Sequence, residues 1–135
     1  MIDNLTKTLK EEHKKIADAL NRVVHLGIGT HEGQAELMKA KDLLLSHLQK
    51  EDKLLYPVLQ KAAKEDSQIK LMLESFAKDM EGISQAALDF FSKYEKGGEG
   101  LEFAKDFGHL FSALSLRIRR EETRLYRIYE EITSK

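Results

Sequence analysis

Cysteine is absent from this chain, and proline occurs once among its 135 residues. Without cysteine the chain cannot form a disulfide, give a thiolate to a metal or hold an iron–sulfur cluster. No stretch approaches the roughly 18 apolar residues needed to span a bilayer, and residues 1–4 lack the charged-then-apolar pattern of a secretory signal. We therefore expect a cytoplasmic protein that has no membrane partner.

An excess of charge of one sign is also missing. The formal net charge is −1 although 33% of the residues are charged, so the sequence does not indicate nucleic acid or an anionic membrane as a partner. The arginines between Arg117 and Arg127 are interleaved with glutamates, which predicts a salt-bridged helix face in solvent. With 41% hydrophobic residues, the composition is typical of a soluble helical protein with a buried core.

Breaks in the chain are few, and they separate long helical stretches. Glycines gather at 27–33 and 97–100, and such clusters interrupt helices. Apolar residues recur elsewhere at helical spacing, as in Leu9, Ile16, Leu20 and Val24, and no run alternates like a strand. We predict helices over about 4–26, 33–63, 67–96 and 101–132, the second bent or broken at Pro57 and the third capped by Asp66 or Ser67. Short connections between four such helices predict an all-α, up-down-up-down four-helix bundle.

The sequence also repeats itself. Residues 47–56 (HLQKEDKLLY) and 117–126 (RIRREETRLY) share one frame, and residues 12–16 and 79–83 form a second, weaker pair. A repeat of this length is typical of a duplicated helical hairpin. We therefore predict a single domain over 1–135, made of two related hairpins at about 1–64 and 65–135.

Residues able to bind a metal recur at fixed helical positions. His47 and Glu51 are four residues apart and share one helix face, as do Arg117 and Glu121. His13 falls on the apolar stripe of the first helix. Each spacing alone is common on exposed helices, but bundles build metal sites from inward imidazoles and carboxylates on facing helices. These nitrogen and oxygen donors suit Fe(II), Mn or Zn better than Ca or Mg.

These positions resemble those of a known family. His13, the motif His47-x-x-x-Glu51 with a following Leu-Tyr-Pro, and the frame Arg117-x-x-x-Glu121 with a following Leu-Tyr are similar to the hemerythrin-like, or HHE cation-binding, domain. The resemblance covers nearly the whole chain and implies a four-helix bundle with a non-haem di-iron centre. Members of the family bind oxygen, or act in iron and redox sensing or in nitric-oxide-related chemistry.

The family pattern implies a ligand set that this chain keeps in part. The pattern has one histidine on the first helix, His-x-x-x-Glu on the second, one or two histidines on the third, and His-x-x-x-Glu or a close variant on the fourth. Histidines of the first two helices hold one iron, those of the last two hold the other, and the carboxylates bridge. By this resemblance, His13, His47, Glu51 and Glu121 are metal ligands.

Met80 and Arg117 stand where the remaining nitrogen ligands would be. A guanidinium stays protonated, and a thioether is a soft ligand that suits Cu(I). The resemblance therefore implies one retained half-site and one lost half-site, so we do not expect an ordinary di-iron oxygen carrier. Arg117 can instead supply positive charge to Glu51 or Glu121 through a bidentate pair.

Two functions remain open from the sequence. In the first, a hemerythrin-like protein binds one non-haem iron at the four retained ligands and has a sensing, storage or small-ligand role, with oxygen or nitric oxide as the ligand. In the second, Arg117 neutralises the core carboxylates, and a metal-free bundle acts as an interaction or structural protein. An enzyme would need an open coordination position and a substrate pocket, and the sequence shows neither.

Other residues near the predicted site are assigned no ligand role. Asp79 and Glu81 flank the inward position of the third helix at about 100° on either side, so we expect both in solvent. His109 is expected in the core or partly exposed. Tyr56 and Tyr126 are equivalent in the repeat, and we expect them to line the core near one end of the pocket with their hydroxyls near water.

Overall fold

The computed structural model describes residues 5–27, 29–95 and 100–134, which are helical except at the connections. The segments are α1 (Leu5–Leu26), α2 (His31–Lys50), η1 (Glu51–Leu55), α3 (Tyr56–Ala63), α4 (Ser67–Lys93), α5 (Gly100–Arg120), η2 (Glu121–Leu125) and α6 (Tyr126–Thr133). None of the described residues forms a strand. The expected start of the first helix at residue 4 and the expected end of the third near residue 96 lie outside the described residues.

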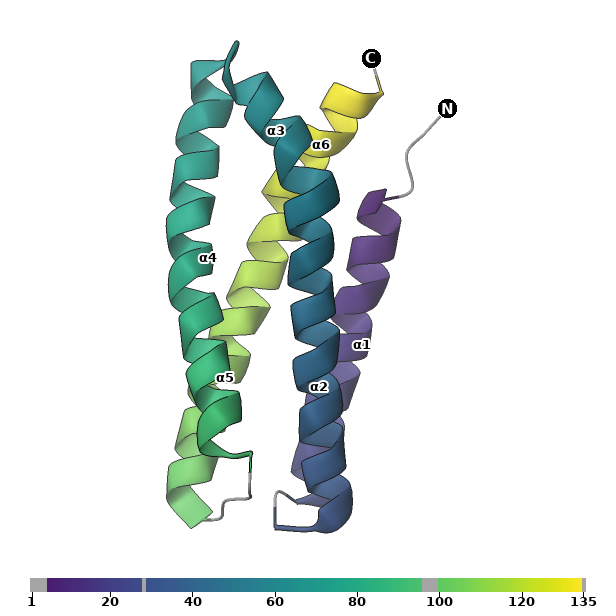
Figure 1. Cartoon of the computed structure of the whole chain (residues 1–135), viewed down its shortest axis with the longest axis vertical. Helices are drawn as coiled ribbons and strands as arrows, with labels where there is room; N and C mark the ends of the chain where they lie inside the picture. The colour runs from purple at the N-terminus through teal and green to yellow at the C-terminus, as the bar shows by residue number, and fades with distance from the viewer. Residues whose placement is uncertain (1–4, 28, 96–99, 135) are drawn as a thin grey trace.

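The eight segments join into four antiparallel rods (Figure 1). The rods are α1, then α2 with η1 and α3, then α4, then α5 with η2 and α6. The start of α1 and the end of α6 lie at the same end of the molecule. The all-α, up-down-up-down four-helix bundle predicted from the sequence is confirmed.

Two π-helical turns interrupt the second and fourth rods at equivalent positions of the repeat. In η1 the amide of Tyr56 donates to the carbonyl of Glu51, and in η2 the amide of Tyr126 donates to the carbonyl of Glu121. The irregularity predicted at Pro57 therefore begins earlier, at Glu51, and Pro57 lies in the first turn of α3. Proline does not explain the second turn, because η2 contains none. Such insertions often mark functional sites.

The core consists of two apolar clusters with a polar layer between them. The cluster at the connection of α1 and α2 comprises Ile16, Ala19, Leu20, Val23, Leu37, Ala40, Leu44, Ala87, Phe90, Phe91, Tyr94, Phe107, Leu110 and Leu114. The cluster near the chain termini comprises Leu9, Leu55, Leu59, Leu73, Phe76, Leu125, Tyr126 and Tyr129. The buried polar residue His13 lies in sequence between Leu9 of one cluster and Ile16 of the other. Val24, expected on the inward stripe, is instead 58% exposed.

The connection between α1 and α2 depends on two glycines. Gly27 has φ = 85°, a left-handed conformation that glycine adopts at no steric cost. The Thr30 side chain caps α2 by accepting a hydrogen bond from the amide of Gly33 at 3.0 Å. Gly33 packs so tightly on Gly27 that an added Cβ would lie 1.8 Å from the Gly27 carbonyl oxygen. After the connection between α3 and α4, Asp66 caps α4 as predicted. Its side chain accepts hydrogen bonds from the amides of Gln68 and Ile69.

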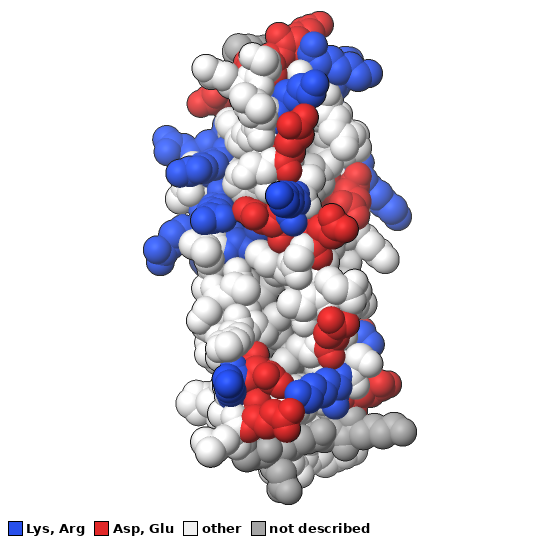
Figure 2. Space-filling view, turned by 90° about the vertical axis from the view of Figure 1, so that its left-hand side faces the viewer, with Lys and Arg blue, Asp and Glu red and all other residues white. Residues whose placement is uncertain are grey.

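Charged side chains are unevenly spread over the face formed by α4 and α5 (Figure 2). Lysine, arginine, aspartate and glutamate are absent from residues 82–88 of α4 and 107–116 of α5, and a band without these charges crosses the face in Figure 2. Beyond the band, Arg120 pairs with Asp79 at 3.0 Å, with both side chains near half exposure. This pair agrees with a solvated, salt-bridged face for the arginine-rich stretch.

The two glycine environments give a matched test of the fold. We expect Gly33→Ala to lower the free energy of unfolding by about 1–3 kcal/mol, because the new methyl group overlaps the Gly27 backbone. Gly82→Ala should raise it by roughly 0.5–1 kcal/mol, since Gly82 is exposed within α4 and its Cβ would meet no atom within 4 Å. Urea denaturation followed by circular dichroism measures both changes, and effects of the same sign would contradict the close contact.

Candidate metal centre

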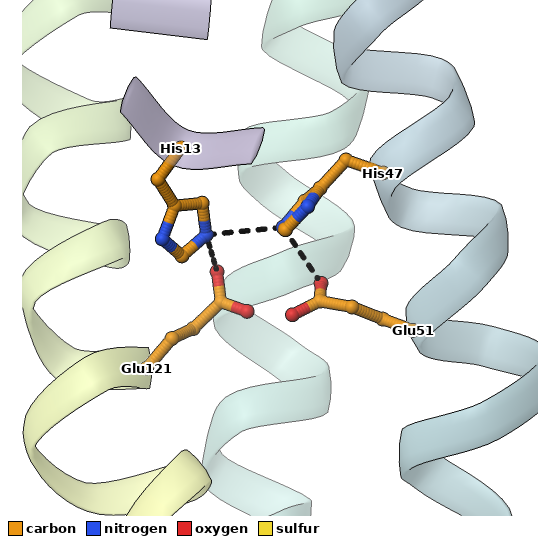
Figure 3. A group of neighbouring side chains, drawn as sticks. All are labelled: His13, His47, Glu51 and Glu121. Carbon is orange, nitrogen blue, oxygen red and sulfur yellow. Dashed lines mark hydrogen bonds and ion pairs between the residues drawn. The ribbon is translucent and has the colours of Figure 1, made fainter. Parts of the chain in front are cut away.

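Four side chains from three rods meet in the polar layer (Figure 3). His13 comes from α1, His47 from α2, Glu51 from η1 and Glu121 from η2. All four are nearly inaccessible to solvent, with Glu51 at 0% exposure. In the part of the chain that the structure describes, this is the group of histidine and acidic residues with the spacing of a metal site. The sequence-predicted ligands are therefore brought together.

The potential ligand atoms face one another across a small volume. His13 Nε2 lies 3.0 Å from His47 Nε2. His47 Nε2 lies 3.6 Å from Glu51 Oε1, and His13 Nε2 lies 3.8 Å from Glu121 Oε1. One ligand atom from each of the four residues can be chosen so that all lie within 4.8 Å of one another. Metal–nitrogen and metal–oxygen bonds of about 2.0–2.2 Å place neighbouring donors about 3 Å apart, so the four atoms can surround one ion after small adjustments.

A further carboxylate contacts the other ring nitrogen of each histidine. The Nδ1 of His13 lies 2.7 Å from Glu122 Oε2, and the Nδ1 of His47 lies 2.9 Å from Glu12 Oε1. Glu12 is itself paired with Lys50. Sequence reasoning did not identify Glu12 or Glu122 as part of the site, although both adjoin predicted ligands. Carboxylates that orient metal-binding histidines in this way are a usual feature of metal sites.

The contacts with Glu122 and Glu12 determine which ring nitrogen of each histidine carries the proton. An ionised carboxylate accepts hydrogen bonds and cannot donate them, so the Nδ1 atoms of His13 and His47 carry protons. In the neutral rings, both Nε2 atoms then present lone pairs to each other at 3.0 Å. Two facing lone pairs repel unless a cation lies between them or one ring is protonated. The arrangement therefore fits a metal ion chemically.

Tyr126 reaches further into the site than the sequence predicted. Its side chain is fully buried, and its hydroxyl donates a 2.7 Å hydrogen bond to Glu51 Oε2. The same oxygen lies 3.2 Å from His13 Nε2 and 3.3 Å from Glu121 Oε2. We expected both repeat tyrosines near water, but only Tyr56 is partly exposed. The π turn explains why Tyr126 lies further inward than expected. It brings residues five apart, here Glu121 and Tyr126, onto one face, whereas an α-helix separates them by about 140°.

Arg117 lies beside the site but does not form the predicted bidentate pair. Its Nε is 3.4 Å from Glu121 Oε1 in a geometry that makes no hydrogen bond. Its other two nitrogens donate to the Phe76 carbonyl at 2.9 Å and to the Tyr56 hydroxyl at 2.8 Å. The guanidinium also lies over the Phe76 ring, 5.2 Å from the ring centre. Arg117 is therefore held mainly by neutral groups, and Glu51 Oε1 has no hydrogen-bond partner among the described residues.

Met80 lines a small cavity beside the ligands. Its side chain is half-buried. The cavity has a volume of about 20 Å³, and Met80 shares its wall with His13, Arg117 and Glu121 and with apolar residues of α1, α2, α4 and α5. A volume of about 10–15 Å³ is enough for one water molecule. The cavity can thus hold one molecule of that size next to the ligand cluster.

Burial changes the pKa values inside the site. Loss of solvent, together with the neighbouring Glu121 carboxylate, raises the pKa of Glu51 to about 10, although Tyr126 and Arg117 act in the opposite direction. Burial lowers the pKa of His47, and the adjacent His13 adds to that effect, while Glu12 opposes it. Without a metal, burial therefore favours the protonated form of Glu51 and the neutral form of His47. A metal would displace the Glu51 proton.

Three of the residues that were assigned no ligand role lie away from the centre. Asp79 lies at the surface and pairs with Arg120, and Glu81 is exposed. His109 is exposed on α5. None of Asp79, Glu81 and His109 belongs to the cluster of potential ligand atoms.

Comparison with known families identifies the class of protein. The family model described as the hemerythrin HHE cation binding domain matches residues 4–129. The chain therefore belongs to this family, and its buried cluster of two histidines and two glutamates can bind a metal. No curated protein and no solved structure gives a significant match. No helix among the described residues is long and apolar enough to cross a membrane.

The raised pKa of Glu51 predicts how the metal-free protein responds to pH. The folded state favours the protonated form of Glu51. The stability that this preference adds is complete below the unfolded-state pKa of Glu51 and is lost as the pH rises toward about 10. We expect chelator-treated protein to lose as much as about 1 kcal/mol of unfolding free energy per pH unit between pH 7 and 9. Glu51→Gln should remove most of this slope, and the exposed Glu81→Gln should retain it. Urea titrations across this range measure the slope, and equal slopes in the two variants would contradict the assignment.

Proposed function

We propose that this protein binds one transition-metal ion, iron, through His13, His47, Glu51 and Glu121. The observation that carries the proposal is the convergence of imidazole and carboxylate lone pairs in a buried layer. The nitrogens of His13 and His47 face each other at 3.0 Å, and Glu51 Oε1 accepts no hydrogen bond from any described residue. Burying such groups is costly unless a cation compensates them.

The donor set limits the choice of ion. Two imidazole nitrogens with one or two carboxylates resemble the arrangement that binds non-haem Fe(II), and they suit Mn and Zn as well. The set lacks the oxygen-rich environment that Ca and Mg prefer. Membership of the hemerythrin family, whose members typically bind iron, favours iron among the remaining ions.

Arg117 is proposed to replace the second ion of the family's centre. Its guanidinium lies next to Glu121 and is anchored on Phe76 and Tyr56, on the side of the site where the nitrogen ligands of a second ion are missing. A fixed positive charge at this point stabilises the two carboxylates. The proposed role of the single ion is sensing, storage or the binding of a small ligand such as oxygen or nitric oxide. The 20 Å³ cavity beside His13 and Glu121 offers space for such a ligand.

A second candidate function is a metal-free bundle that serves as an interaction or structural protein. The buried ion pair between Arg117 and Glu121 favours it, since a guanidinium can neutralise a carboxylate without a metal. In this function, Glu51 is neutralised by protonation, and a proton on one of the two histidine rings must compensate the facing lone pairs. The metal-binding function accounts for both features, so we prefer it.

Metal content separates the two functions. After anaerobic loading with ferrous iron and desalting, we expect about one iron per chain by mass spectrometry, because one half-site retains its ligands. His47→Ala should lose the iron, and the exposed His109→Ala should keep it. Iron at about 100 times its dissociation constant should also raise the unfolding free energy by about 2.7 kcal/mol. A metal-to-protein ratio near zero, with stability indifferent to iron and chelator, would favour the metal-free bundle.

Restoring the missing ligands tests the assigned role of Arg117. Arg117→His with Met80→His should raise the content toward two irons per chain, since it replaces a competing cation with a nitrogen ligand and adds a second one from α4. Arg117→Leu with Met80→His is the matched control, because it removes the cation without supplying the ligand on the last rod, and it should stay near one iron. An unchanged ratio in the double histidine variant would show that α4 and α5 do not converge on a second site.

A further inference from the structure

We propose that Tyr126 is an additional ligand of the metal, binding ferric iron through its phenolate oxygen. This inference rests on the proposed metal-binding function and adds a fifth residue to the four ligands predicted from the sequence. It follows from the position of one atom. The Tyr126 hydroxyl oxygen lies inside the cluster of ligand atoms, and the side chain has no exposure to solvent.

The distances around this oxygen are those between neighbouring ligands of one ion. It lies 2.7 Å from Glu51 Oε2, 3.2 Å from His13 Nε2 and 3.3 Å from Glu121 Oε2. The two histidine Nε2 atoms are separated by a similar 3.0 Å. Ligand bonds of about 2.0–2.2 Å separate adjacent donors by about 3 Å. The phenol oxygen is therefore spaced from the other donors as a further ligand of the same ion would be.

Few protons are available to these crowded atoms. A phenol has one proton to donate, and Tyr126 gives it to Glu51. The lone pairs of the same oxygen then lie near a carboxylate oxygen of Glu121 and the Nε2 of His13. An ion bound at this point would take all of these atoms as ligands. The ring of Tyr126 is also fixed, because it stacks on the His13 ring with an interplanar angle of 13° and a centroid distance of 5.7 Å.

The repeat provides an internal comparison. Tyr56 occupies the equivalent position after the first π turn, but its hydroxyl accepts a hydrogen bond from Arg117 at 2.8 Å and is not among the contacts of the histidine–glutamate cluster. One tyrosine thus faces the proposed ion and the other faces the cation that replaces the second ion. A phenolate ligand favours the ferric state, since Glu51, Glu121 and Tyr126 together balance three positive charges in a buried site.

The experiment uses ferrous-loaded, desalted protein that is then oxidised with ferricyanide. Each Fe(II) gives one electron to ferricyanide. The phenol O–H bond breaks as the iron–oxygen bond forms, and the proton passes to the buffer. Ferric phenolates absorb visible light by charge transfer, so we expect a coloured protein whose resonance Raman spectrum contains tyrosine ring modes that shift on ring deuteration. Electron paramagnetic resonance verifies the ferric state, and mass spectrometry gives the iron content.

Matched variants separate the possible outcomes. Tyr126→Phe should retain iron and lose the visible band, and Tyr94→Phe, whose hydroxyl bonds to Asp106 in the other half of the bundle, should retain both. A band that survives in Tyr126→Phe, or ferric wild-type protein without a band, overturns the tyrosine ligand and leaves the proposed function intact. Wild-type protein that holds no iron overturns both. If Tyr126→Phe does not fold, the variants Tyr56→Phe, Tyr94→Phe and Tyr129→Phe decide, since the Raman modes must persist in all three.

Discussion

The rest of the structure depends on the burial of two carboxylates between two apolar clusters. Glu51 and Glu121 have almost no contact with solvent, and a buried carboxylate needs protons, hydrogen bonds or a cation. The surrounding residues supply hydrogen bonds and positive charge. Tyr126 donates to Glu51, Arg117 brings positive charge to Glu121, and the Nε2 atoms of His13 and His47 lie beside the two carboxylates. The apolar layers on both sides strengthen these interactions by excluding water.

The two π turns connect this constraint to the chain. Each begins at a buried glutamate and ends before a tyrosine, so glutamate and tyrosine five residues apart come to the same face. The duplicated frame thus delivers the same pair of side chains twice. The first copy adds His47 and the second adds Arg117 at the preceding helical turn. One hairpin therefore contributes a histidine at the position where the other contributes a fixed cation.

Most of the fold and the set of four clustered side chains could be predicted from the sequence. Apolar periodicity and glycine clusters located the rods, and the repeat indicated that His47 and Glu121 lie on facing helices. Tyr126 was misplaced because the prediction assumed regular α-helix, and one inserted residue in the turn rotates its side chain inward. Glu12 and Glu122 were missed because their contacts depend on side-chain conformations between rods. The prediction of a bidentate pair for Arg117 was wrong because the Phe76 carbonyl and the Tyr56 hydroxyl compete for its donors.

A guanidinium replaces the charge of a metal ion but not its chemistry. It has a fixed charge and donates hydrogen bonds in fixed directions, whereas a metal ion changes oxidation state and accepts additional ligands. Two nitrogens of Arg117 donate hydrogen bonds to Phe76 and Tyr56. Arg117 therefore anchors α5 to α4 and α3 whether or not the neighbouring site is filled. The proposed ion would then enter a bundle that is already held together on one side. On the other side, the ion would displace the proton of Glu51 and contact His13 and His47, and such a local change is one that a sensor or a store of iron can use.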